Sequence, residues 1–151
     1  IFAYWGFNES FKGPAGLPAF RQALTDYLQK QKIADYGKGP VRVVLFSPLA
    51  HEVITSDYFD PKVAAHNNEN LALYTAAMAE VAAEQKVQFV DLFHASQKLY
   101  QQATTPLTIN GIHLTEEGDK VLATAQARKD SVQSRAEATA QFARLSRRRR
   151  Q

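Results

Sequence analysis

Two short loops hold the side chains of this 151-residue chain that are best suited to chemistry. The loop GFNES places Asn8 two residues after Gly6, so an uncharged amide donor follows a residue that permits a sharp turn. The loop NGIHLTEEG places His113 just before an expected helix, with Asn110 three residues earlier. Because an imidazole exchanges its proton near neutral pH, His113 is a candidate acid or base.

These loops must be positioned by the elements around them, and the chain reads as strands that alternate with helices. Apolar and β-branched runs predict strands at 1–5, 41–47 and 87–93. The spacing of apolar residues predicts one helix at 17–33 and a second that begins at Asn67 or Asn68, either of which would be its N-cap. This order favours right-handed βαβαβ units and hence an α/β fold with a parallel sheet.

Both loops are expected at one edge of that sheet, because ligands of open α/β sheets bind beyond the carboxyl ends of the strands. Asn8 follows the first predicted strand directly. His113 follows a shorter helix expected at 96–102 and precedes a last helix that begins near Glu116, with Thr115 as its N-cap. We therefore predict that Asn8 and His113 meet over the same edge.

The first strand indicates an incomplete sheet. IFAYW is apolar throughout, which is typical of a strand covered on both faces and paired on both sides. Three strands are also fewer than the about five of a doubly wound sheet. We therefore expect that one or two strands preceding Ile1 are missing from this sequence.

Composition favours one globular domain, since 45% of the residues are hydrophobic, 22% are charged and no apolar run is long enough to cross a bilayer. The net charge of +3 is uneven: residues 128–151 carry eight Lys or Arg against Asp130 and Glu137, which gives +6 there and −3 for the rest. We expect a domain at 1–127 and a basic tail at 128–151, helical or disordered. A solvated or frayed helix end explains such a tail better than nucleic-acid or lipid binding does.

A family resemblance rests on both loops. GFNES resembles the Gly-x-Asn-Asp/Glu block of the SGNH (GDSL-type) hydrolase superfamily, and NGIHLTEEG resembles its last block, in which Asp and His are three residues apart. VVLFSP and NLALYTAAMAEVAAEQKVQFVDLF are similar to its penultimate strand and to the helix and strand that follow. The resemblance covers about residues 1–125 and implies a three-layer α/β/α, flavodoxin-like sheet that lacks its N-terminal strands.

The same resemblance implies a serine esterase. Its nucleophile would lie in a Gly-Asp-Ser block after the first strand, and because no such block occurs here, we expect the serine upstream and this chain alone to be inactive. His113 would take the serine proton, and Asn8 would donate to the oxyanion. The family has Asp where this chain has Asn110, so either a backbone carbonyl orients the ring of His113 or activity is reduced or absent.

Further contacts are expected around these residues. The resemblance makes Gly6 and Glu9 substrate-binding positions. His51 and Glu52 follow the second strand and either touch the substrate or form a satisfied loop pair. A metal cluster of His51, Asp57, Asp60 and His66 matches no known ligand spacing, so neither a metal nor another cofactor is expected.

The implied substrates are carboxylic esters, with acetyl esters of carbohydrates as one class. The alternative is a non-catalytic ligand-binding or interaction domain that keeps the scaffold after losing the nucleophile and the acid of the triad. The zero cysteine count excludes disulfides but leaves the cellular compartment and the oligomeric state open.

Overall fold

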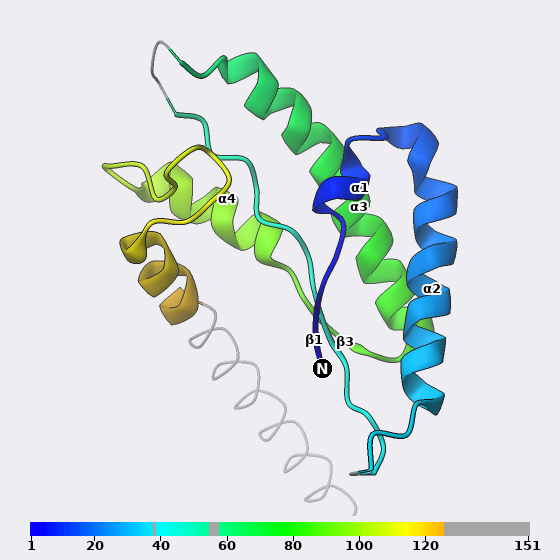
Figure 1. Ribbon diagram of the computed structural model, residues 1–151. Helices are drawn as coiled ribbons and strands as arrows, with labels where there is room; N and C mark the ends of the chain where they lie inside the picture. Colours follow the sequence, from blue (N-terminus) through cyan, green and yellow to red (C-terminus); the bar gives the residue numbers. More distant parts are fainter. Residues whose placement is uncertain (38, 55–57, 126–151) are drawn as a thin grey trace, which may run out of the picture.

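A computed structural model describes residues 1–37, 39–54 and 58–125 of the chain. Its sheet consists of three parallel strands in the order β1-β2-β3: β1 is Phe2–Tyr4, β2 is Val44–Phe46 and β3 is Gln88–Val90. Helices connect these strands, as Figure 1 shows. The predicted α/β fold with a parallel sheet is confirmed.

Two long helices cover one face of the sheet. These are α2, Leu17–Ile33, whose bounds match the prediction, and α3, Pro61–Gln85. Ala3 and Leu45 pair in register and contribute to the buried core with Leu24 and Leu28 of α2 and Met78 of α3. On the surface, an ion pair of 2.6 Å between Arg21 and Glu80 joins the two helices.

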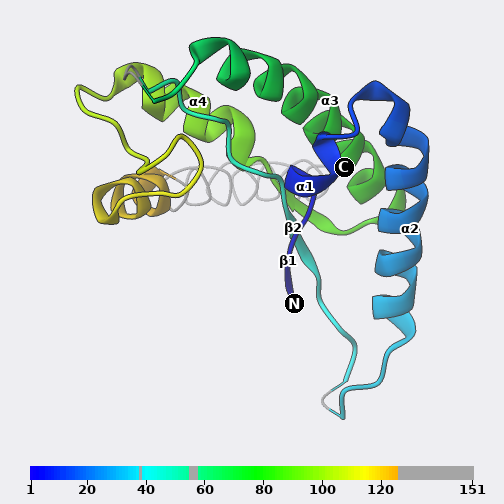
Figure 2. The same cartoon turned by 45° about the horizontal axis from the view of Figure 1, so that its top comes forward.

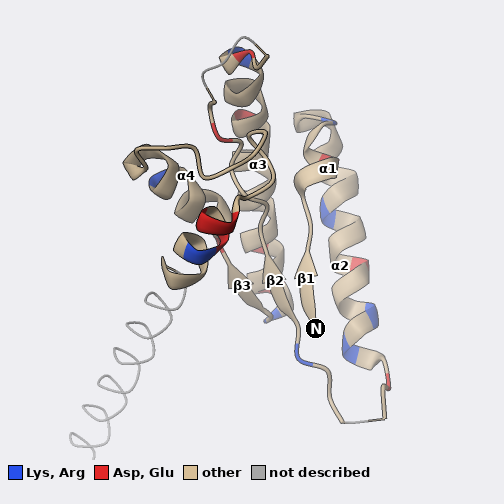
Figure 3. Ribbon diagram, turned by 60° about the vertical axis from the view of Figure 1, so that its left-hand side comes forward, with Lys and Arg blue, Asp and Glu red and all other residues tan. Residues whose placement is uncertain are grey.

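The other face of β1 is exposed, which corrects the prediction that this strand is covered on both faces. Side chains alternate along a strand, so Phe2 and Tyr4 point away from Ala3, and they are 72% and 66% exposed. Both rings pack on Phe46 of β2, at centroid distances of 5.4 and 4.8 Å. Figure 3 shows the strands side by side, with α2 beside β1. Within the described residues, α2 and α3 pack only on the side of Ala3.

The start of α3 also differs from the prediction. Neither Asn67 nor Asn68 is its N-cap, because the helix already begins at Pro61. Asp60 is the N-cap and accepts the backbone N–H of Lys62 at 2.9 Å. A proline in the first turn after an aspartate is a strong helix start, since proline has no N–H to satisfy there.

The next helix, α4, is Leu92–Gln102 and so begins before the predicted 96–102. Its N-cap is Asp91, which accepts the backbone N–H of His94 at 3.0 Å and lies 2.6 Å from Nδ1 of the same histidine. The buried hydroxyl of Ser47 accepts the N–H groups of Leu92 and Phe93. These caps end the predicted third strand early, at Val90.

The chain continues through a loop to a helical segment at 116–125. Thr115 is its N-cap, as predicted, and accepts the N–H of Gly118 at 3.0 Å. Figure 2 shows this segment and α4 on the side of the molecule opposite α2. The expected tail at 128–151 lies outside the described residues. In the described ranges, no helix is both long enough and apolar enough to span a membrane.

Candidate active site

A cavity of about 400 Å³ lies at the carboxyl ends of β1 and β2. The segment after β1 contributes Gly6, Asn8 and Glu9 to its lining, and the segment after β2 contributes Ser47 and Pro48. Leu114 and Asp119 also line the cavity, whereas His113, the neighbour of Leu114, is not one of its lining residues. The cavity therefore joins the two loops that carry Asn8 and His113, although they are about 100 residues apart.

The turn after β1 requires a glycine. Gly6 has φ of +99°, and a Cβ there would lie 2.9 Å from Sδ of Met78 and 3.3 Å from Cδ of Pro48. Its N–H donates to the carboxylate of Glu9 at 3.0 Å. Of the two expected substrate contacts, Gly6 thus shapes the cavity, while Glu9 lines it and fastens the short helix α1, Phe7–Ser10.

Asn8 lies in the first turn of α1 and is exposed at the cavity. Its side chain makes no hydrogen bond to any residue that the structure describes, whereas the side chains of the next two residues, Glu9 and Ser10, are hydrogen-bonded to the backbone. Both amide hydrogens of Asn8 are therefore available to a ligand in the cavity.

His113 is exposed, and its ring is held by Asn110. The side-chain oxygen Oδ1 of Asn110 accepts the backbone N–H groups of Ile112 and His113, at 3.2 and 3.0 Å, and lies 3.1 Å from Nδ1 of the His113 ring. Two backbone donors identify this amide atom as the oxygen. Since the oxygen can only accept, Nδ1 carries the ring proton and Nε2 keeps its lone pair.

This contact shows how the ring of His113 is held, while reduced or absent activity stays a prediction. The ring is oriented by the Asn110 side chain itself and not by a backbone carbonyl. An amide oxygen can select the tautomer as a carboxylate does. It carries no charge, however, and so gives less stabilisation to an imidazolium.

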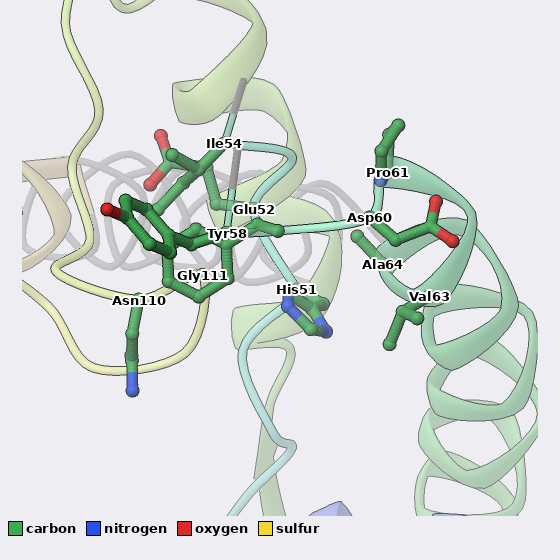
Figure 4. A pocket seen from close by; sticks show the side chains of 11 residues that line it. His51, Glu52, Ile54, Tyr58, Asp60, Pro61, Val63, Ala64, Asn110 and Gly111 are labelled. Carbon is green, nitrogen blue, oxygen red and sulfur yellow. The ribbon is translucent and has the colours of Figure 1, made fainter. Parts of the chain in front are cut away.

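The structure places His51 apart from Asn8. His51 lines a second cavity of about 170 Å³, together with residues at the start of α3 and with Asn110 and Gly111. These two belong to the loop between α4 and the helical segment at 116–125, called the late loop below. In Figure 4 the side chain of His51 lies between the late loop and the first turns of α3, where Val63 and Ala64 are labelled. The Nδ2 atom of Asn67 lies 3.0 Å from Nδ1 of His51, and burial lowers the pKa of this histidine.

Glu52 follows the second of the two predicted alternatives, because it is satisfied within the loops. It is buried and accepts the N–H of Leu107 at 2.9 Å and the N–H of Thr108 at 2.7 Å. No local pattern could reveal this role, since the partners are 55 and 56 residues away in sequence. Across the described ranges, no group of three or more His, Asp or Glu residues is arranged to hold a metal ion.

Solved structures of esterases share this fold. Axe2, an acetylxylan esterase from Geobacillus stearothermophilus, matches with a TM-score of 0.60 and 17% identity over 85% of this chain and 57% of its own. The M. smegmatis aryl esterase matches with a TM-score of 0.58 and 17% identity over 87% of this chain and 60% of its own. A gut microbial diltiazem-metabolizing enzyme matches with a TM-score of 0.60 and 18% identity over 83% of this chain and 32% of its own.

These three solved structures share the fold of this chain, which agrees with the predicted α/β architecture. The chain spans 57% of the length of Axe2 and 60% of the length of the aryl esterase. No protein-family model and no curated protein matches the sequence.

Proposed function

We propose that this chain, which has the fold of the SGNH hydrolases, supplies the base and the oxyanion donor of a serine esterase that hydrolyses carboxylic esters. His113 is the general base and acid, Asn110 orients it, and Asn8 binds the oxyanion. The nucleophilic serine comes from sequence outside these 151 residues, because they contain no Gly-Asp-Ser block.

In the first half of the reaction, Nε2 of His113 removes the proton from the serine hydroxyl while the serine oxygen attacks the ester carbonyl. The carbonyl π electrons move to its oxygen, which accepts a hydrogen bond from the Asn8 amide. The C–O bond to the alcohol then breaks, and the imidazolium returns its proton to the leaving oxygen. Water repeats these steps on the acyl-serine and releases the carboxylic acid.

The observation that carries this proposal is the cavity that Asn8 shares with Leu114, the residue next to His113. The amide there is uncharged and unengaged among the described residues, as an oxyanion donor must be. The lone pair on Nε2 of His113 follows from the bond between Nδ1 and Asn110. Donor and base are thus supported by separate contacts on separate loops.

Acetyl esters of carbohydrates are the substrate class that we propose first. One structural neighbour is named an acetylxylan esterase, and another is named an aryl esterase. The cavity mixes apolar wall residues, including Trp5 and Phe7, with polar ones such as Asn8 and Ser47. A small acyl group and a polar alcohol suit such a lining.

The test uses the protein expressed together with any coding sequence that precedes Ile1, alongside the 151-residue chain. A fluorophosphonate probe, which labels activated serines, is expected to label the longer protein only. That protein should hydrolyse p-nitrophenyl acetate and acetylated xylo-oligosaccharides, and His113→Ala should abolish both turnover and labelling. Full turnover in the His113→Ala variant would exclude His113 as the base, and labelling of the 151-residue chain would contradict the proposed origin of the serine.

A further inference from the structure

Glu52 is a buried acid that is hydrogen-bonded to the late loop, which carries His113. Its side chain is 6% exposed and lies in the segment between β2 and α3. The carboxylate oxygens accept the N–H groups of Leu107 and Thr108 and also the hydroxyl of Thr108. All three partners are donors, and Glu52 forms no ion pair with any residue in the described part of the chain.

The hydrogen bonds that begin at Glu52 continue through Thr108 to Gly111. Oγ1 of Thr108 accepts the N–H of Gly111 at 3.0 Å, and the backbone N–H of Glu52 donates to the Gly111 carbonyl at 2.8 Å. The N–H of Gly111 is therefore bound by Thr108, and its carbonyl is bound by the backbone of Glu52. Gly111 has φ of +85°, and a Cβ there would lie 2.5 Å from Nε2 of His51, so the backbone at Gly111 packs closely against the His51 ring.

The acid is itself anchored to α3. The side-chain amide of Asn68 donates to the carbonyl of His51 and accepts the N–H of His51, each at 2.8 Å. This pairing fixes the backbone immediately before Glu52. Figure 4 shows His51 and Glu52 on the segment that runs between the late loop and α3.

The loop passes this constraint on to His113. The N–H of Ile109 donates to the carbonyl of His113 at 2.8 Å, and the N–H of Thr115 donates to the carbonyl of Leu107 at 2.9 Å. Asn110 lies within the turn that these two backbone hydrogen bonds close, directly before Gly111. The position of its oxygen, which selects the tautomer of His113, therefore depends on residues that Glu52 holds.

We infer that Glu52 is a positioning residue for His113: through Thr108 and Gly111 it holds Asn110 where its oxygen keeps the proton of His113 on Nδ1. This role rests on the proposed function, in which Nε2 acts as the base. Glu52 touches neither the ring of His113 nor the cavity that Asn8 lines. Its effect on chemistry is therefore indirect.

A purely structural role predicts a different result. A buried polar group that loses a partner destabilises the whole fold, and that effect alone leaves the folded molecules unchanged. A positioning role changes the ring within folded molecules. The two are separated by a spectroscopic signature measured well below the unfolding midpoint.

The experiment records the ring ¹⁵N resonances of His113 in the 151-residue chain at about pH 8, where an imidazole is neutral. The parent chain is expected to show distinct Nδ1–H and Nε2 signals of one tautomer. Glu52→Gln keeps the shape but replaces one accepting oxygen with a donor, so the two signals should move toward each other as the tautomers mix. The amides of Thr108 and Gly111 should exchange about tenfold faster in this variant.

Two further variants keep the test decisive. Leu28→Ala removes a buried side chain of α2 far from the loop and should lower stability while leaving the His113 signals and both exchange rates unchanged. Thr108→Val removes the hydroxyl that links Glu52 to Gly111 and leaves the carboxylate with its two backbone donors, and it replaces Glu52→Gln if that variant does not fold. If Glu52→Gln or, in its place, Thr108→Val is folded and its His113 signals are unchanged, the inference is overturned.

The ring signals do not depend on ester hydrolysis, so this inference and the proposed function can fail separately. In the longer protein, Glu52→Gln should reduce kcat more than it raises KM. Shifted ring signals with no hydrolysis by any form would support the role of Glu52 and count against the esterase. Normal kcat in a variant whose ring signals have shifted would overturn the positioning role in catalysis.

Discussion

Oδ1 of Asn110 lies 3.1 Å from Nδ1 of His113 and accepts two backbone N–H groups of the same turn. The contact fixes the orientation of the ring without placing a negative charge beside it. In a triad with an acid, one carboxylate supplies both effects. At this site the orientation is present and the negative charge is absent, and substitutions at position 110 can test each effect.

Asn110→Asp should raise kcat of the longer protein by about 10- to 10³-fold, because an adjacent carboxylate stabilises the imidazolium that forms in the transition state by about that factor. The same oxygen can accept the same three N–H groups, so the fold is expected to be kept. The comparison is kcat with p-nitrophenyl acetate for the parent, Asn110→Asp and Asn110→Ala, where Ala removes orientation as well. Equal kcat in all three would show that the residue at 110 does not act through His113.

Asn8→Ala should lower kcat by about 10²- to 10³-fold, which corresponds to the loss of one oxyanion donor. The free energy of unfolding should change by less than about 0.5 kcal/mol, because Asn8 is exposed and unengaged among the described residues. Asn8→Asp is the matched control: it keeps the size but cannot donate when ionised, so it should be as slow as Ala. Activity retained in Asn8→Asp would point to a role other than donation.

The parts of the fold that have a local sequence signal could be predicted. The bounds of α2 were predicted correctly because apolar positions recur along it and loops with glycine and proline enclose it. Thr115 was recognised as an N-cap because a capping residue directly precedes its helix. The spacing of Asn110 and His113 was recognised, but a backbone carbonyl was named as the group that would orient the ring, where the structure has the Asn110 side chain.

Other features were missed because one signal masked another or because the partners are distant in sequence. Asp91 caps α4, but it sits inside an apolar run that reads as a strand. The helix start at Asp60 precedes any apolar periodicity, so the pattern favoured Asn67 and Asn68 instead. The contacts of Glu52 span more than 50 residues and leave no periodic trace.

Gly6→Ala should destabilise the fold by about 1–3 kcal/mol, because φ of +99° disfavours a side chain and the new Cβ would crowd Met78. Gly37→Ala is the matched control. Gly37 also has a positive φ, +74°, but apart from its chain neighbours no described atom lies within 4 Å of where a Cβ would be. Urea unfolding measures both variants. The difference between them isolates the crowding, and equal losses would show that backbone strain alone accounts for the effect at Gly6.

The stability of the fold should fall with acidification in a way that depends on His51. Burial lowers the pKa of His51 in the folded chain below the 6.5 of an ordinary histidine. At a pH between the lowered pKa and 6.5, the unfolded chain therefore binds a proton that the folded chain does not. The contribution of His51 is therefore complete above pH 6.5 and is lost as the pH falls through the lowered value. His51→Gln should flatten the dependence of the unfolding free energy on pH below pH 6.5. Leu71→Val should lower that free energy equally at each pH, and a slope unchanged by His51→Gln would assign the pH dependence to another group.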